Sequence, residues 1–140
     1  MLFGTYQHNM DAKNRIFIPA KHREELGEGF VVAKSAREKC LRIYSRDQWL
    51  AYMKEIKSMN GKNRDAVLRW LSMDAVQQPP DTQGRIVLSP TLIKHAQLEK
   101  NAYIIGCGDY AEIWSEANYQ AMIDSVDGES MNEILESFGL

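Results

Sequence analysis

Short apolar runs, many of them alternating with polar residues, follow one another along the chain and are separated by polar turns. Runs of four to five residues bounded by Asp, Asn, Gly or Pro are typical of β-strands. The pattern predicts strands at Arg15–Ile18, Phe30–Ala33, Leu41–Tyr44, Arg85–Leu88, Ala102–Ile105 and Ala111–Trp114, with a further short strand before each of the turns Asp11–Asn14 and Asp81–Gly84. Strands this short need partners from elsewhere in the chain to form a stable sheet.

Helix signals lie between and after these strands. A brief helix is predicted over Pro19–Leu26, and Pro90 suits the first position of another helix, where its missing N–H costs nothing. Serines suited to N-capping precede three helical segments, at Ser45, Ser89 and Ser115. Gln48 follows Ser45 at capping-box spacing. We therefore assign the chain to the α+β class, mainly β with helices.

The chain repeats itself at a constant offset. The segment from Asp11 to Ile18 recurs between Asp81 and Leu88, an offset equal to half the length of the chain. The same offset relates further matching pairs, namely Ile43-Tyr44-Ser45 with Ile113-Trp114-Ser115 and Trp49 with Tyr119. Several separated matches indicate a tandem duplication of one small unit. Because neither unit can bury a core alone, we predict two units packed as an intramolecular pseudo-dimer.

Composition changes divide the chain further. We predict a first unit over 5–47, a helical connector over 48–76, a second unit over 77–120 and an acidic C-terminal helical tail over 121–140. The pair Pro79-Pro80 ends the helical pattern of the connector and marks the boundary before the second unit.

The composition, 44% hydrophobic and 26% charged, is that of a soluble globular protein. No apolar run approaches the roughly 20 residues of a membrane span, and the N-terminus lacks a signal-peptide pattern. Two cysteines are too few for a disulfide scaffold or a Cys-built zinc site. We expect a cytoplasmic protein without membrane association.

Charge is distributed unevenly. The net charge of −2 combines +4 over residues 1–46, +2 over 47–108 and −8 over 109–140, where no basic residue occurs. A basic front half beside an acidic tail means that the net charge does not exclude a polyanion partner. The alternative interpretation of the tail is a solvated acidic helix without a specific partner.

The repeated Asp-x-x-x-Arg motif suits anion recognition. Its turn-shaping residues can accept backbone N–H groups or adopt left-handed backbone, and are Asp11, Asn14, Asp81 and Gly84. Arg15 and Arg85 begin the following strands, where each guanidinium can bind a phosphate or a guanine edge bidentately. The alternative is an Asp–Arg salt bridge that only closes the turn.

The first copy carries more positive charge than the second. Lys13 lies within the first motif, where the second has Gln83, and Lys21 and Arg23 follow on the next helix. If a polyanion binds, we expect the first copy to dominate and Arg85 to contribute less. Lys21 and Arg23 also fit a solvated helix face.

No pattern indicates an enzyme. The segment Gly106–Asp109 matches no nucleotide-binding fingerprint and is predicted to be a hairpin turn. The three histidines show no metal-ligand spacing, and no serine or cysteine has an evident general base. We therefore predict no catalytic residues, no metal, no cofactor and no small-molecule substrate.

Several segments together resemble the MraZ family. They are Met1-Leu-Phe-Gly-Thr-Tyr6, Asp-x-Lys-x-Arg-x-x-x-Pro-Ala-Lys at 11–21, Tyr-Ser-x-x-x-Trp at 44–49, Asp81-x-x-Gly-Arg85, and Ile104-Ile-Gly-x-Gly-Asp109 with Ile113-Trp114. The resemblance spans roughly residues 1–125. The chain differs from the family pattern at Asn14, where glycine is usual, and at Ser89-Pro90, where an Ile-Pro helix entry is usual.

The resemblance implies two AbrB-like swapped-hairpin units in one pseudo-dimeric double-split β-barrel with flanking helices. It implies a DNA-binding transcriptional regulator of the division and cell-wall gene cluster, located on the nucleoid. It further implies a ring-shaped homo-oligomer that binds short direct repeats in its own promoter. The family motifs fall on Asp11/Arg15 and Asp81/Arg85, with Lys13 inside the first.

A second interpretation is an antitoxin-like protein-binding module, because swapped-hairpin units also serve in antitoxins and fold alone does not decide function. Its acidic C-terminal helix would bind a small basic protein. Salt-sensitive, sequence-selective DNA binding favours the regulator, whereas a co-purifying basic protein favours the antitoxin.

Overall fold

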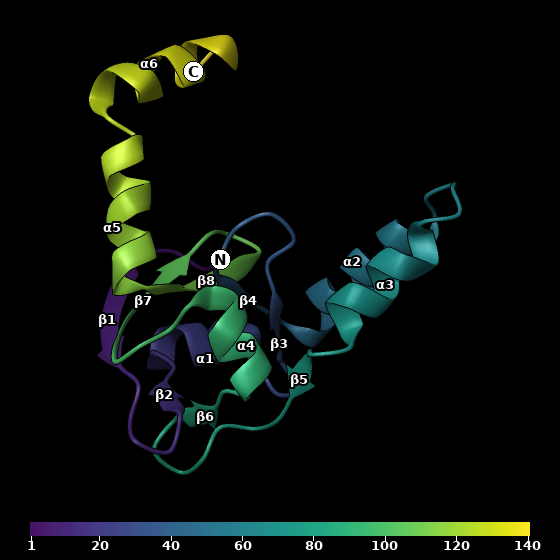
Figure 1. The fold of residues 1–140 in the computed structure, drawn as a ribbon, viewed down its shortest axis with the longest axis vertical. Helices are drawn as coiled ribbons and strands as arrows, with labels where there is room; N and C mark the ends of the chain where they lie inside the picture. The colour runs from purple at the N-terminus through teal and green to yellow at the C-terminus, as the bar shows by residue number, and fades with distance from the viewer.

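The computed structural model describes all 140 residues and has an α+β fold with eight strands and six helices (Figure 1). The strands are β1 (Thr5–Asn9), β2 (Arg15–Phe17), β3 (Val31–Lys34), β4 (Leu41–Tyr44), β5 (Val76–Gln77), β6 (Arg85–Val87), β7 (Asn101–Gly106) and β8 (Tyr110–Ser115). The helices are α1 (Ala20–Leu26), α2 (Arg46–Lys57), α3 (Arg64–Ser72), α4 (Pro90–Ala96), α5 (Glu116–Ser125) and α6 (Gly128–Ser137). The α+β prediction is therefore confirmed.

The strands that follow the two repeated motifs pair with each other. β2 and β6 form a separate antiparallel two-stranded sheet in which Ile16 faces Ile86, its equivalent in the second half. One backbone bond extends the pairing at each end, from Ile18 N to Gly84 O at 3.0 Å and from Leu88 N to Asn14 O at 2.8 Å. The two halves therefore meet at equivalent positions in this small sheet.

The other strands form an antiparallel sheet in the order β1-β7-β8-β4-β3-β5. At its centre β4 pairs with β8, and Arg42 faces Glu112, which again occupies the equivalent position of the repeat. Farther out, β1 of the first half pairs with β7 of the second, and β5 at the start of the second half pairs with β3 of the first. Each half therefore contributes an outer strand to the other.

This pairing pattern corrects the expectation of a barrel. The strands divide into the two sheets, and the hydrogen-bonded ladder does not close. β2 and β6 are only three residues long, and each pairs with the other and with no strand of the larger sheet. β1 and β5 are the edge strands of the larger sheet. Short strands that leave one sheet to pair elsewhere cannot close a barrel, which needs a continuous ring of paired strands.

Both halves contribute to one hydrophobic core. Its 17 buried residues come from both sheets, from α1 and α4, and from the segments beside them, where Leu2, Ile18, Phe30, Leu88 and Leu98 lie. The largest fully buried aliphatic side chains of this cluster are Ile16, Ile18, Leu41, Ile43, Leu88, Leu92, Ile104 and Ile113. Since β2 and β6 supply Ile16 and Ile86 to this core, their opposite faces and the loops before them are held outward at a fixed place.

The local helix and turn predictions are confirmed. The hydroxyls of Ser45, Ser89 and Ser115 accept the backbone N–H three residues later, as N-caps do. Pro90 lies at the start of α4. The segment between β7 and β8 is the predicted hairpin turn, closed by the bond from Cys107 N to Tyr110 O at 2.8 Å.

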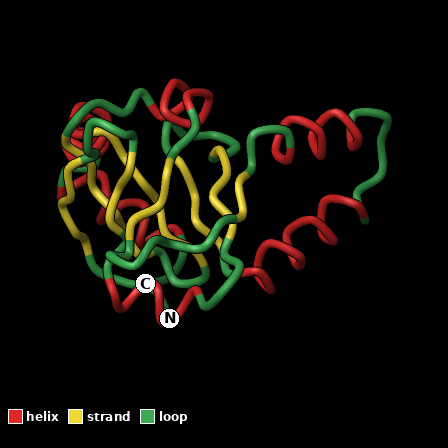
Figure 2. Tube along the Cα trace, turned by 90° about the horizontal axis from the view of Figure 1, so that it is seen from below, coloured by secondary structure: helices red, strands yellow, loops and turns green.

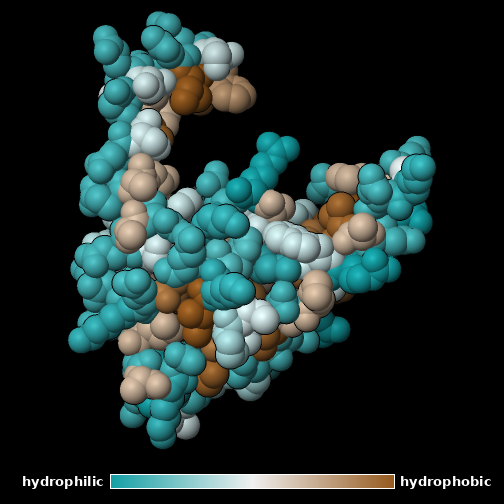
Figure 3. Space-filling model, in the orientation of Figure 1, coloured by the Kyte–Doolittle hydropathy of each residue, from teal (hydrophilic) through white to brown (hydrophobic).

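Two helical pairs project from this body. α2 and α3 extend to one side as a hairpin (Figures 1 and 2), held by Lys34, whose ammonium lies 3.0 Å from Asp74 and 3.9 Å from the centre of the Trp70 ring. α5 extends away from the larger sheet, and α6 lies across the end of α5 that is farther from the sheet. Neither helix has a buried residue. Figure 3 shows apolar side chains exposed on both projections. None of the six helices is both long and apolar enough to cross a bilayer.

Candidate nucleic-acid interface

The first motif forms a tight loop between β1 and β2. One oxygen of the Asp11 carboxylate accepts the backbone N–H groups of Lys13 and Arg15, both at 2.9 Å. The Asp11 carbonyl accepts the N–H of Asn14 at 3.0 Å, and Asn14 has the left-handed φ of 58°. Asparagine tolerates this conformation better than most residues. Asn14 therefore fulfils the role predicted for it in the turn.

The second motif repeats this geometry. Asp81 accepts the backbone N–H groups of Gln83 and Arg85, both at 2.9 Å, and Gly84 has a φ of 80°. Hydrogen bonds from Arg85 and Gln83 favour the ionised carboxylate, so they lower the pKa of Asp81. The pKa of Asp11 is lowered in the same way, first by the backbone N–H of Arg15. Both loops therefore contain an aspartate that stays charged at neutral pH.

Each aspartate also holds its own arginine. Arg15 Nε donates to Asp11 Oδ2 at 2.7 Å, and Arg85 Nε donates to Asp81 Oδ2 at 2.9 Å. About a quarter of each arginine side chain remains exposed, 27% for Arg15 and 28% for Arg85. The salt bridge considered as an alternative is therefore present, but it uses Nε and leaves the arginine accessible. Holding a guanidinium in one direction reduces the entropy that it loses on binding an anion.

The two-stranded sheet brings the two arginines together. Ile16 and Ile86 are buried, and since successive residues of a strand point to opposite faces, Arg15 and Arg85 lie on the outer face. Arg85 Nη1 lies 3.6 Å from the Asp11 carboxylate of the other loop. The face lies at the opposite end of the molecule from α6 (Figure 1). It presents two arginines and two carboxylates on a rigid support.

The other cationic candidates lie in different places. Lys13 is exposed in the first loop. Lys21 is exposed on α1 and lines a pocket of about 260 Å³ with the N-terminal residues Met1 and Phe3. Lys13 therefore accompanies the motif, whereas Lys21 accompanies the N-terminal segment.

Arg23 reaches the loop of the opposite half. Its Nε donates to the Ile18 carbonyl at 2.9 Å, and its guanidinium lies 5.3 Å from the centre of the Phe17 ring. A Cβ atom added to Gly84 would lie only 2.7 Å from the guanidinium carbon of Arg23. Sequence reasoning placed Arg23 with the first copy and missed this contact. The sequence carried no signal of it, because a glycine at 84 and an asparagine at 14 are both explained by the positive φ of the turn.

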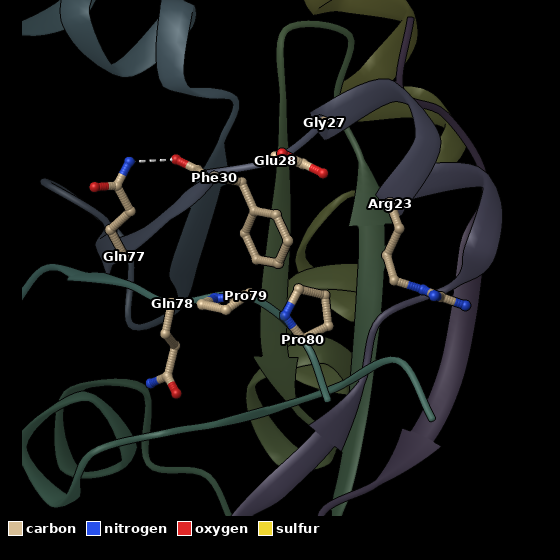
Figure 4. A pocket seen from close by; sticks show the side chains of 9 residues that line it. Arg23, Gly27, Glu28, Phe30, Gln77, Gln78, Pro79 and Pro80 are labelled. Carbon is tan, nitrogen blue, oxygen red and sulfur yellow. Dashed lines mark hydrogen bonds between the residues drawn. The ribbon is translucent and has the colours of Figure 1, made fainter. Parts of the chain in front are cut away.

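Arg23 also lines a pocket of about 640 Å³ (Figure 4). Phe30 and Pro80 lie on facing sides of the pocket, and Gln77 Nε2 donates to the Gly29 carbonyl at 2.6 Å. Its charged side chains are Arg23 and Glu28. The pocket lies beside the segment that leads from β5 into the second loop.

A cluster missed by the sequence analysis lies on the larger sheet. The Glu112 carboxylate is 3.7 Å from the Cys40 sulfur and 3.6 Å from the Cys107 sulfur. Burial, with the negative charge of Glu112 adding to it, raises the pKa of Cys40 to about 12 and that of Cys107 to about 11. Both thiols are protonated at neutral pH, and a thiol is a poor nucleophile compared with a thiolate. The cluster therefore does not provide a nucleophilic site.

Comparisons with known proteins agree with the repeat. A family model described as "MraZ protein, putative antitoxin-like" matches residues 1–69 and again residues 71–137. The chain is 38% identical, over the full length of both proteins, to a protein of Caldanaerobacter subterraneus named transcriptional regulator MraZ. It is 42% identical to one of the same name from Alkaliphilus oremlandii, over 96% of this chain and 94% of that protein. One from Pediococcus pentosaceus is 34% identical over the full length of both.

Proposed function

Because the chain belongs to the MraZ family, we propose that it is a DNA-binding transcriptional regulator that contacts duplex DNA with its two Asp-x-x-x-Arg loops. The observation that carries this proposal is the paired placement of Arg15 and Arg85 on one outer face, each held by its own aspartate. The relatives are named transcriptional regulators, and the loops supply the groups such a protein needs.

The loops suit recognition of base edges. A guanidinium held through Nε still has its terminal nitrogens, which match a guanine edge or a phosphate. Arg15 is the principal reader in this proposal, with Lys13 beside it, and Arg85 contributes less because it also approaches Asp11. Lys21 and Arg23 add positive charge from α1.

One chain offers few contacts to phosphates. We therefore propose further that the protein forms a ring-shaped homo-oligomer, which binds short direct repeats in its own promoter. Linked weak contacts give avidity when the spacing of sites matches. Such assembly is supported by large apolar side chains that are exposed in the single chain. They are Leu50, Met59, Val67, Trp70 and Met73 on the α2–α3 hairpin, and Ile134, Leu135, Phe138 and Leu140 at the C-terminus. The acidic C-terminal segment complements the basic residues of that hairpin, Arg46, Lys54, Lys57, Lys62, Arg64 and Arg69.

The same proposal includes the regulated genes, the location in the cell and the division of the chain into units. They are regulation of the division and cell-wall gene cluster, a place on the nucleoid in the cytoplasm, and two AbrB-like units over 5–47 and 77–120 with a connector over 48–76 and a tail over 121–140. The exchange of outer strands between the halves supports units of the swapped-hairpin kind.

The test is fluorescence anisotropy with duplex DNA from upstream of the gene and a shuffled duplex of equal length. Arg15→Ala should weaken binding to the upstream duplex by about 5- to 150-fold, since a bidentate contact is worth about 1–3 kcal/mol. Arg85→Ala should weaken it less. Arg37→Ala, in the exposed β3–β4 connection, is the control and should bind as the wild type does. Light scattering should show the same oligomer for every variant, and full affinity in Arg15→Ala would refute the assignment.

The antitoxin-like alternative is favoured by the description of the matching family and by the acidic α6, where Ile134 and Leu135 are exposed. Purification of the tagged protein from its native host tests this alternative. A stoichiometric small basic protein that is lost on deletion of residues 128–140 supports it. Its absence, together with sequence-selective DNA binding, supports the regulator.

A further inference from the structure

The repeated motifs bring little net charge to the outer face. Asp11 lies against Arg15, and Asp81 lies against Arg85, so each motif is a formally neutral pair. Binding to DNA depends on cations that neutralise phosphates. The positive charge of this face must therefore come from residues outside the Asp–Arg pairs.

Arg23 has the properties of such a cation. No carboxylate lies within ion-pairing distance of it. Its Nε is held by the Ile18 carbonyl, its guanidinium is near the Phe17 ring, and its terminal nitrogens form no hydrogen bond with the protein. Three contacts, including the one with Gly84, fix its direction while two nitrogens remain available to an oxyanion.

The position of Arg23 matters because the second loop lacks its own lysine. Gln83 stands where the first loop has Lys13. The residue equivalent to Arg23 in the second half is Ile93, which packs against the core instead. The first half therefore places Arg23 against the second loop, whereas the second half has no cation at the equivalent position and reaches the first loop only through Arg85, near Asp11.

We propose that Arg23 and the Gly84 turn form a phosphate-binding site for the DNA backbone on the second loop, with charge from one half and turn from the other. This inference rests on the proposed DNA-binding function. The absence of a Cβ atom at Gly84 is part of the site, since a side chain there would displace the guanidinium. Arg23 thus contributes charge and position, whereas Arg15 contributes base readout.

The first measurement is the salt dependence of binding to the upstream and shuffled duplexes. Arg23→Gln removes the charge and keeps a donor for the Ile18 carbonyl. It should make the slope of log affinity against log salt shallower by about 0.9, and weaken binding to both duplexes alike, about eightfold at 0.1 M salt. Arg23→Lys should restore most of the slope. Arg37→Ala, which also removes one positive charge, should leave the slope unchanged.

A second pair of variants tests the contact with the turn. Gly84→Asn tolerates the left-handed backbone, as Asn14 does, but adds a side chain where Arg23 lies. It should reproduce the slope change of Arg23→Gln, and combining the two should add no further change. Gly108→Asn, in the turn between β7 and β8, is the matched control and should leave the slope unchanged, because Gly108 also has a positive φ, of 85°, and a Cβ atom added there would have no neighbour within 4 Å.

The outcomes separate the two proposals. If the wild type binds neither duplex, the proposed function fails and this inference fails with it. If the wild type binds the upstream duplex but both Arg23→Gln and Gly84→Asn keep its slope, the DNA-binding function stands and the site on the second loop is wrong. Thermal unfolding of each variant confirms that it is folded at the binding temperature.

Discussion

The two Asp-x-x-x-Arg loops share a backbone and differ in their surroundings. In both, the aspartate accepts two backbone N–H groups at 2.9 Å and the fourth residue has a positive φ. Around this common frame, the first loop has Lys13 and an asparagine, whereas the second has Gln83 and a glycine against Arg23. The two halves therefore share the turn, while the charge around it differs between them.

The aspartates differ too. Asp11 contacts its own Arg15 and lies 3.6 Å from Arg85, whereas Asp81 pairs with Arg85 alone. Both arginines therefore lie near the aspartate of the first loop, whereas Arg23 of the first half lies against Gly84 of the second loop.

The largest effect is expected from substitutions in the β2–β6 pair, which supports both loops. Ile16→Ala and Ile86→Ala each remove a buried side chain at the β2–β6 pair and should each cost about 2–5 kcal/mol of unfolding free energy, by urea denaturation. Val87→Ala, at a side chain that is 45% exposed, should cost less than about 0.5 kcal/mol. A loss at only one isoleucine would show that the loops are supported separately.

A smaller effect distinguishes the two aspartates by pH. The folded protein lowers the pKa of Asp11 and of Asp81, so each stabilises the fold above its usual pKa of about 3.9 and loses that contribution as pH falls through its folded pKa. Asp11→Asn and Asp81→Asn should therefore lower the urea midpoint at neutral pH and matter little in strong acid.

Asp11→Asn should have the larger effect of the two, because Asp11 approaches both arginines. The comparison uses urea midpoints of the two variants and the wild type across the acid range. Equal losses, or a loss in Asp11→Asn that persists unchanged in strong acid, would contradict the assigned contacts.

The smallest effect is expected from exchanging Lys13 and Gln83, the charged and uncharged residues at equivalent positions of the two loops. Lys13→Gln should make the salt slope of DNA binding shallower by about 0.9, and Gln83→Lys should steepen it by the same amount. The double variant moves the lysine from one loop to the other and should return to the wild-type slope. Slopes that do not respond in either loop would place the DNA elsewhere on the molecule.

Features set by neighbouring residues were predictable from the sequence. The caps at Ser45, Ser89 and Ser115, the left-handed Asn14 and the bonds to Asp11 all depend on nearby groups in the chain, so their signals are local. The constant offset of the repeat likewise identified Ile16 and Ile86 as equivalent residues, although only the structure shows that they face each other in β2 and β6. Both Asp–Arg motifs were placed correctly in turns followed by strands.

Features set by distant residues were not predictable. The expected barrel gave way to two sheets because backbone hydrogen bonds are alike for every strand, so sequence patterns do not specify which strands pair. The contact between Arg23 and Gly84 joins positions in different halves of the sequence, across the interface between them. The Glu112 cluster also gathers side chains from separate strands and loops.

By itself, the sequence determined the repeated unit, the turn chemistry of both Asp-x-x-x-Arg loops and the family resemblance, because each depends on residue identity and spacing along the chain. Only the tertiary structure decided that the halves exchange outer strands, that Arg15 and Arg85 share one outer face, and that Arg23 lies against Gly84 of the opposite loop. These depend on how two similar units pack around one core, where burial of apolar surface and backbone pairing select the arrangement.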